Sequence, residues 1–140
     1  MKRILFVFLF PLLIFSQKSD LKFYEVFSKS QNSKVSCYRI PSIITTDKGT
    51  IIAAVDERVF SCNDLKSNRD INIVIRTSND EGKSWSSINR LVDYPFGESA
   101  SDPSMIFDKK TKQIYLFYNY MNLEKDKDVY YLKYVTSLDN

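Results

Sequence analysis

The sequence predicts an all-β fold, and within that class a β-propeller, from three observations. Apart from the first residues, no segment repeats apolar side chains at helical spacing over about eleven positions. Short runs of β-branched and aromatic residues instead alternate with polar turns. A turn pattern of Ser, any residue and Asp follows two of these runs, at Ser78 and again at Ser137, 59 positions further on. One turn motif for each group of short strands favours a propeller over a β-sandwich.

The first 16 residues are not expected to join the fold. Met1, Lys2 and Arg3 precede an apolar run from Ile4 to Phe15, which ends at Ser16. A basic start and a short apolar core are typical of a secretory signal peptide, and this core is too short to span a bilayer. We therefore expect cleavage near Ser16, a secreted, periplasmic or cell-surface location, and no transmembrane segment.

The chain after the signal begins with an arm, residues 17–34, and continues as a hairpin. Residues 21–27 alternate loosely, as a strand or a late-packing arm would, and residues 28–36 are polar and typical of a loop. Residues 38–46 and 50–55 are β-branched runs on either side of Asp47-Lys48-Gly49, which is a strong hairpin signal. Residues 56–69 are polar and without period, which predicts an exposed loop of the kind that carries function.

Residues 78–85 predict a specialised turn between strands at residues 71–77 and 86–92. Asp80 offers an acceptor to the backbone of the turn, Gly82 provides a positive φ, and Trp85 can pack beneath the turn. We expect Ser78, Asp80, Gly82 and Trp85 to have a structural role.

The remaining sequence predicts a second loop at residues 93–101 and strands at residues 103–108, 113–122 and 130–136. The rings of Tyr115, Phe117, Tyr118 and Tyr120 are interpreted mainly as sheet packing, with sugar stacking as the alternative. A compact blade takes about 40–45 residues, so the chain holds about two blades. Two blades cannot close a ring or cover their exposed sheet edges.

Composition excludes several kinds of site. Lys and Arg number 20 and Asp and Glu 17, and without Lys2 and Arg3 the charge is close to neutral. Such a balance gives no indication of nucleic-acid binding. The sequence has no histidine, which removes Ser-His-Asp and Cys-His catalysis and the usual histidine metal sites. We expect neither a metal nor another cofactor.

The turn at residues 78–85 resembles the Asp box (BNR repeat), Ser-x-Asp-x-Gly-x-Thr-Trp, with Ser84 in place of Thr. This motif recurs in the blades of sialidases (neuraminidases) and of other propellers. Upstream, Tyr38-Arg39-Ile40-Pro41 is similar to the sialidase motif whose arginine is the first of three that clamp the carboxylate of sialic acid. The resemblance covers residues 35–140. It implies a six-bladed β-propeller of the sialidase type, of which this truncated domain supplies about the first two blades.

Spacing extends the resemblance to three further residues. Arg58 follows Arg39 by 19 positions and Asp64 follows it by 25, close to the intervals of a second sialidase arginine and the general-acid aspartate. Asp102 matches a family aspartate that lines, with the residue matching Arg58, the side of the pocket facing the sugar's 4-hydroxyl. The resemblance therefore implies a catalytic Asp64 and substrate-binding Arg39, Arg58 and Asp102. It places the tyrosine nucleophile, its glutamate and the other two clamp arginines beyond residue 140.

The residues themselves leave alternatives open. Arg39 stands in an otherwise apolar strand, so its guanidinium either grips a ligand carboxylate bidentately or pairs internally with Asp56 or Asp64. Arg58 would alternatively form a surface pair with a neighbouring carboxylate. Asp64 would alternatively be an ordinary loop aspartate, with Asp70 as the acid.

The two cysteines, Cys37 and Cys62, stand two positions before Arg39 and Asp64. If those two side chains meet in one site, the thiols are neighbours, and in an exported chain they can form a disulfide. The alternative is that both are small buried residues.

The function that the resemblance implies is an exo-α-sialidase. Such an enzyme is a retaining glycosidase that removes terminal sialic acids from glycoproteins, glycolipids or oligosaccharides, with tyrosine as nucleophile. Residues 17–140 alone are expected to be inactive, because they lack most of that site. The alternatives are a trans-sialidase and a non-catalytic Asp-box propeller that binds glycan or protein. A binding module has no chemical reason to keep Arg39, Arg58, Asp64 and Asp102 at these spacings.

Overall fold

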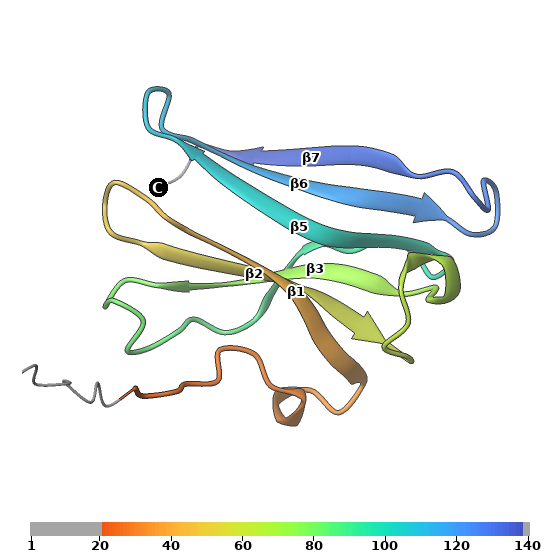
Figure 1. Ribbon diagram of the computed structural model, residues 1–140, viewed down its shortest axis with the longest axis horizontal. Coiled ribbons are helices and arrows are strands. Elements are labelled where there is room, and N and C mark those ends of the chain that lie inside the picture. The colour runs from red at the N-terminus through yellow and green to blue at the C-terminus, as the bar shows by residue number, and fades with distance from the viewer. Residues whose placement is uncertain (1–20, 139–140) are drawn as a thin grey trace, which may run out of the picture.

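The computed structural model describes residues 21–138, which form two antiparallel β-sheets (Figure 1). The first sheet contains, in order, β1 (Val35–Thr45), β2 (Ile51–Val59), β3 (Ile71–Ser78) and β4 (Asn89–Val92). The second contains β5 (Glu98–Asp108), β6 (Gln113–Asn122) and β7 (Tyr131–Ser137). The helical elements in this range are two 3-10 turns, η1 (Lys29–Gln31) and η2 (Leu65–Ser67). The all-β prediction is confirmed.

Several predictions about the chain ends lie outside residues 21–138. The signal peptide is predicted at residues 1–16, and the second Ser-x-Asp pattern includes Asp139, so the structure describes neither in full. Within the described range, no helix is long and apolar enough to cross a membrane.

A tight turn joins the first two strands of the first sheet. The β1–β2 hairpin closes where the Thr46 N–H donates to the Thr50 carbonyl, and Gly49 takes a φ of 83° at the expected turn. Strands β2 and β3 then pair without interruption from Ile51 opposite Ser78 to Arg58 opposite Ile71. Because this register has no bulge, the two ends of the sheet are fixed relative to each other.

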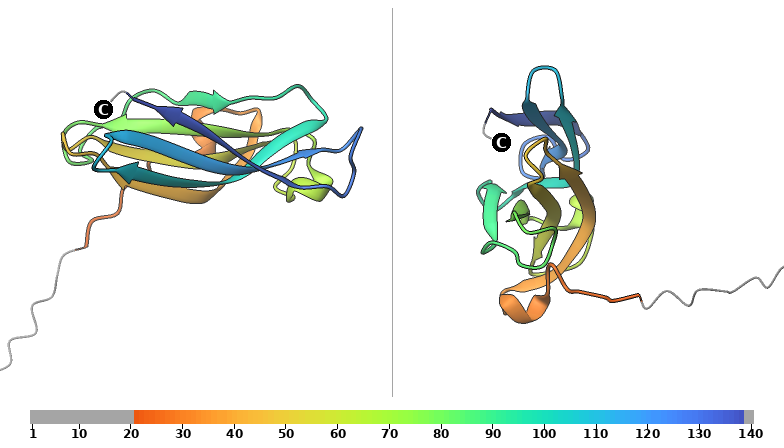
Figure 2. Two further views of the ribbon diagram at one scale, coloured as in Figure 1. Left: turned by 90° about the horizontal axis from the view of Figure 1, so that it is seen from above. Right: turned by 90° about the vertical axis from the view of Figure 1, so that its left-hand side faces the viewer.

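The main core lies between the two sheets. Its buried residues come from both: Ala54, Ile73 and Val92 from the first sheet, and Ala100, Leu116, Tyr118 and Tyr120 from the second. Burying one such aliphatic side chain contributes about 1.5–3 kcal/mol, so this shared apolar face holds the sheets together. The views in Figure 2 show the strands of both sheets running roughly along the long axis of the molecule. Tyr118 and Tyr120 thus pack in the core, as the favoured interpretation had it.

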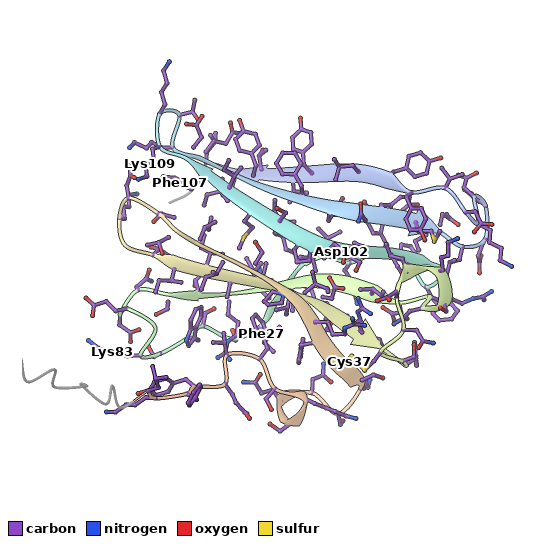
Figure 3. The ribbon with its side chains drawn as sticks, viewed as in Figure 1. Phe27, Cys37, Lys83, Asp102, Phe107 and Lys109 are labelled. Carbon is purple, nitrogen blue, oxygen red and sulfur yellow. A yellow bond between two sulfur atoms is a disulfide. The ribbon has the colours of Figure 1, made fainter. Side chains whose placement is uncertain are left out.

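The Asp-box turn closes on itself at one end of the first sheet. The Asp80 carboxylate accepts hydrogen bonds from the Ser84 N–H at 2.9 Å and the Ser84 hydroxyl at 2.5 Å, and the Ser78 hydroxyl accepts one from the Gly82 N–H at 2.9 Å. Gly82 has a φ of 83°, as predicted. Lys83 in this turn and Cys37 in β1 lie at opposite ends of the first sheet (Figure 3).

Two predicted loops are shorter than expected. Residues 56–59 belong to β2, and Asp56, Glu57 and Arg58 are almost fully buried. The loop prediction was wrong here because all three charges are paired inside the fold, Glu57 with Arg90 and Asp56 with Arg58. Pairing offsets the desolvation cost that otherwise keeps charges out of a core. Strand β5 likewise begins at Glu98, inside the predicted loop at residues 93–101.

The N-terminal arm contains no strand between residues 21 and 27. It contacts the first sheet at two residues: the Phe27 ring lies 5.5 Å from that of Tyr38, and Arg76 Nη1 donates to the Val26 carbonyl at 2.6 Å. Strand β1 starts at Val35, inside the polar stretch that was expected to be a loop.

Candidate active site

Three of the four residues singled out from the sequence for the site, Arg39, Asp64 and Asp102, line one open pocket of about 610 Å³. Arg39 comes from β1, Asp64 from the residue before η2, and Asp102 from β5. The pocket lies at the Arg58 end of the first sheet, away from the Asp box. Its further lining residues include Lys66, Ser101, Asn119 and Tyr130.

Arg39 reaches the pocket from a distorted part of β1. The pairing of β1 with β2 slips between Arg39 and Ser42, and Ile40 has a φ of 55°, which is unusual for a β-branched residue. The Arg39 guanidinium donates through Nη1 to the Cys62 carbonyl and to Asp64 Oδ1, each at 3.2 Å. Its side chain remains 43% exposed, so the guanidinium faces both Asp64 and the open pocket.

Arg58 lies beneath the pocket rather than on its surface. Its side chain is 1% exposed and forms an ion pair with the buried Asp56, with Nη2 2.9 Å from Asp56 Oδ2. Its Nη1 donates to the carbonyls of Cys62 and Asn63, both at 2.9 Å, and to Asp64 Oδ1 at 2.6 Å. The surface-pair alternative is therefore wrong, because the pair is internal. A substrate contact by Arg58 requires Asp64 to move away from it.

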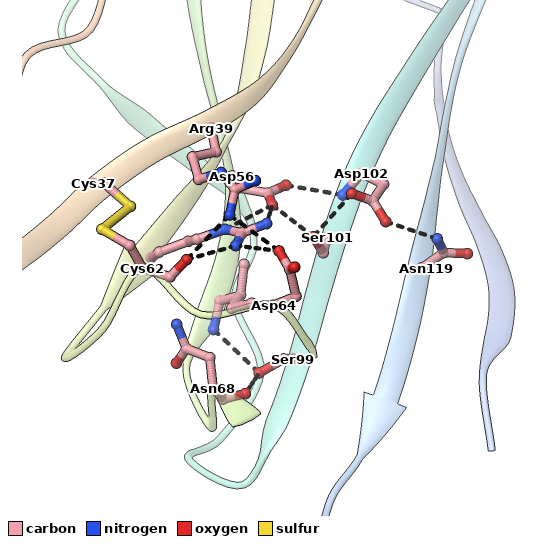
Figure 4. Close-up of polar contacts among 12 residues, drawn as sticks. Cys37, Arg39, Asp56, Cys62, Asp64, Asn68, Ser99, Ser101, Asp102 and Asn119 are labelled. Atoms are coloured by element: carbon pink, nitrogen blue, oxygen red, sulfur yellow. Dashed lines mark hydrogen bonds and ion pairs between the residues drawn. A yellow bond between two sulfur atoms is a disulfide. The ribbon is translucent and has the colours of Figure 1, made fainter. Parts of the chain in front are cut away.

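Asp64 is exposed and ionised in this arrangement. Its side chain is 76% exposed, and its carboxylate contacts both Arg58 and Arg39 (Figure 4). The hydrogen bond from Arg58 first, then the charges of Arg58 and Arg39, lower the pKa of Asp64. A general acid must be protonated part of the time near neutral pH, so these two guanidinium groups oppose the predicted role until one is drawn away.

Asp102 occupies a bulge in β5 and faces Asn119 of β6. Its φ is 60°, and the pairing of β5 with β6 slips between Ser101 and Ser104. The Asp102 N–H donates to Asp56 Oδ1 at 2.9 Å, and the Asn119 amide donates to Asp102 Oδ2 at 2.9 Å. The bulge thus aims the Asp102 carboxylate at the pocket.

Comparison with known proteins connects this geometry to one family. No known family profile matches the chain. The chain is 33% identical to an anhydrosialidase of Macrobdella decora, over 69% of this chain and 15% of that protein. It is 31% identical to a sialidase of Bacteroides fragilis, over 58% of this chain and 16% of that protein. The chain is a sialidase homologue. It spans about 15% of the length of these relatives.

Solved structures support the same relationship. A leech intramolecular trans-sialidase in complex with 2,7-anhydro-Neu5Ac superposes with a TM-score of 0.64 at 27% identity, covering 74% of this chain and 18% of that one. The intramolecular trans-sialidase of Ruminococcus gnavus, in complex with oseltamivir carboxylate, superposes with a TM-score of 0.61 at 29% identity, covering 69% of this chain and 24% of that one. The fold of the sialidase homologue is therefore that of the sialidase β-propeller, and its two sheets correspond to about two blades, as predicted.

A disulfide joins β1 to the loop that carries Asp64. Cys37 and Cys62 are bonded, with their Cα atoms 5.7 Å apart, within the usual range for a disulfide. The Cys62 carbonyl accepts from both Arg39 and Arg58, so the bond anchors the segment on which the two arginines converge.

Two residues that sequence reasoning did not assign to the site hold it together. Asp56 accepts from Arg58, from the Ser101 hydroxyl at 2.6 Å and from the Asp102 N–H, although burial raises the pKa of this carboxyl. Asn119 contacts Asp102 directly. The sequence contained one indication of the Asp56–Arg58 pair: the two residues are two positions apart, and such residues share one face of a strand. Asn119 lies opposite Ser101 in the β5–β6 pairing, which only the register reveals.

Asp70, the alternative acid, lies elsewhere. Its carboxylate accepts from the Asn72 amide at 3.0 Å, and it does not line the pocket. Among the described residues, no group of three or more His, Cys, Asp or Glu side chains is arranged to hold a metal ion.

Proposed function

We propose that the protein carrying this chain is a retaining exo-α-sialidase that removes terminal sialic acids from glycoconjugates. The convergence of Arg39, Asp64 and Asp102 on one pocket, in a homologue of sialidases, is the observation that carries the proposal. The relatives described above are named as a sialidase and an intramolecular trans-sialidase, and these names support a glycosidase that acts on sialic acid.

Arg39 would bind the carboxylate of the substrate. Its guanidinium is planar and partly exposed, which suits a two-pronged contact with a carboxylate. The same guanidinium now contacts Asp64, so a substrate carboxylate would compete with Asp64 for it. Binding would thereby remove one of the two cationic partners that keep Asp64 ionised.

Asp64 would then act as acid and base. As the glycosidic C–O bond breaks, Asp64 would transfer its proton to the leaving oxygen while a tyrosine of the complete protein bonds to the sugar carbon. In the second step Asp64 would take a proton from the attacking water, which restores the acid. On the side facing the sugar's 4-hydroxyl, Asp102 would accept hydrogen bonds and Asn119 would donate them. Arg58 would hold Asp64 from beneath the pocket.

The proposal extends to partners and location. The substrates would be sialylated glycoproteins, glycolipids or oligosaccharides, and no cofactor would be required. The signal peptide predicted at residues 1–16 would direct the protein to the periplasm, the cell surface or the medium.

An intramolecular trans-sialidase is the second candidate. It is favoured by relatives named as an anhydrosialidase and as intramolecular trans-sialidases, one of them in complex with 2,7-anhydro-Neu5Ac. In that reaction the sugar's own 7-hydroxyl would replace water as the attacking group. The product would then lack one water relative to free sialic acid.

The test is to express the complete protein and its Asp64→Asn variant and to incubate each with 3'-sialyllactose. We expect the wild type to release lactose and Asp64→Asn to lose about 100-fold or more of that rate, the usual contribution of a general acid. Mass spectrometry of the sugar product separates hydrolysis from the anhydro reaction. Glycan binding by the wild type without any turnover would instead favour the non-catalytic module.

Residues 17–140 alone should be inactive. The described part offers one arginine to the substrate carboxylate and one candidate acid, whereas groups that act as a unit lose nearly all activity when one is missing. A fluorogenic sialoside assay on the purified piece checks this, and clear turnover would refute it.

A further inference from the structure

A second pocket, of about 370 Å³, lies beside the candidate active site and exposes two phenylalanine rings. Phe60 and Phe96 are 73% and 57% exposed, and their rings meet edge to face with centroids 5.9 Å apart. Around the rings the lining is polar and includes Ser61, Asn63 and Ser67. Leaving two large apolar rings in water is costly, so such a paired exposure is typical of a binding surface.

The two rings are held in place from below. Phe60 has a φ of 64°, which a bulky residue rarely adopts and keeps only where the surrounding structure enforces it. Cys62, two residues further on, is fixed by its disulfide, and the Asn68 amide donates to the Ser61 carbonyl at 2.9 Å. The Phe60 segment is therefore tied down at Ser61 and at Cys62, the two residues that follow Phe60.

Phe96 is restrained by Arg69. The Arg69 guanidinium carbon lies 5.8 Å from the centre of the Phe96 ring, and the next residue, Gly97, donates its N–H to the Arg69 carbonyl at 2.9 Å. The pair is thus a preorganised aromatic surface rather than two loose side chains.

The aromatic pocket continues the candidate active site on the side of Asp64. Ser67 lines both pockets, and Asn63, which lines the aromatic one, directly precedes Asp64. A general acid must face the oxygen of the leaving group. If Asp64 is that acid, the leaving group departs on its side of the site, toward Phe60 and Phe96.

We propose that Phe60 and Phe96 form a subsite for the leaving group, which binds the neutral pyranose next to sialic acid. The inference rests on the proposed function. The C–H face of a pyranose would pack against the rings, and its hydroxyls would meet the polar groups of Ser61, Asn63 and Ser67. An apolar surface with a few polar groups at its rim is typical of a pocket for such an amphipathic ligand.

The test compares two substrates in the complete protein. 3'-Sialyllactose has a pyranose leaving group, whereas sialyl fluoride has a single-atom leaving group that cannot reach the rings. For Phe60→Ala and Phe96→Ala we expect kcat/KM on sialyllactose to fall about tenfold, the scale of a lost apolar contact, and kcat/KM on sialyl fluoride to stay within about twofold of wild type. Phe96→Tyr should retain most activity on both substrates.

The control is Tyr24→Ala, which removes a 74% exposed ring from the N-terminal arm and should change neither rate. If Phe60→Ala and Phe96→Ala lower kcat/KM equally on both substrates, or on neither, the subsite is overturned while the proposed function stays intact. A wild-type protein that cleaves neither substrate would overturn the proposed function, and the subsite with it.

Discussion

At the scale of single residues, the site depends on which group holds each guanidinium. Arg39 and Arg58 both donate to Asp64 Oδ1, but Arg58 is 1% exposed and Arg39 is 43% exposed. Only Arg39 can therefore exchange its partner for a ligand without leaving a buried charge unpaired. This difference separates an arginine that can bind substrate from one that supports the site.

Arg39→Lys in the complete protein should lose most sialidase activity, about tenfold or more in kcat/KM, because an ammonium replaces a planar two-pronged donor. Its melting temperature should stay close to that of wild type, because the Arg39 ion pair with Asp64 is exposed and such pairs contribute little. Turnover of a sialoside and thermal melting, measured on the same preparation, check both statements. A variant with wild-type kcat/KM would show that Arg39 does not grip the substrate.

At the scale of elements, the Asp box closes a turn with its own hydrogen bonds and lies far from the pocket. Ser78 pairs with Ile51 at one end of the β2–β3 ladder, and Arg58 pairs with Ile71 at the other. Asp80 is held by hydrogen bonds from within its own turn, chiefly from Ser84, which lower its pKa from 3.8 to about 2. We therefore expect the carboxylate to contribute to the stability of the hairpin.

The pH dependence of folding should reveal this contribution. Because the pKa of Asp80 is lower in the folded state, its stabilising effect is present above about pH 4 and is lost as the pH falls toward 2. Asp80→Asn should therefore have a lower melting temperature than wild type at neutral pH. The difference between the two melting temperatures should narrow as the pH falls from about 4 toward 2. Activity per folded molecule at neutral pH should be unchanged. Glu81→Gln, which alters an 88% exposed side chain in the same turn, is the matched control and should show no such narrowing. If Asp80→Asn melts like wild type yet is inactive, the structural role of the Asp box is wrong.

At the scale of the whole molecule, one buried carboxylate joins the two sheets. Asp56 in β2 binds Arg58 in its own strand and, across the sheet interface, Ser101 and the backbone of Asp102. The same residue thus couples the packing of two blades to the geometry of the pocket.

Asp56→Ala should destabilise the complete protein by about 3–5 kcal/mol, because it leaves the Arg58 charge buried without its main partner. Urea denaturation measures the loss. Asp102→Ala, which removes an exposed carboxylate from the same network, is the control and should cost far less. Equal midpoints for the two variants would show that Asp56 does not support the sheet interface.

The sequence alone determined the fold class, the β1–β2 hairpin, the Asp-box turn and the residues of the family motif. These are local properties: a glycine at a positive φ, alternating β-branched residues, or a spacing along the chain. Which charges are buried depends instead on partners far along the chain, as when Asp56 meets Ser101 across 45 positions. For that reason the sequence assigned Asp56 and Arg58 to an exposed loop, and it did not reveal Asn119 or the pair of Phe60 and Phe96. Local periodicity shows which side chains of a strand share one face. The contacts of these residues form only when segments far apart in the sequence come together in the folded chain.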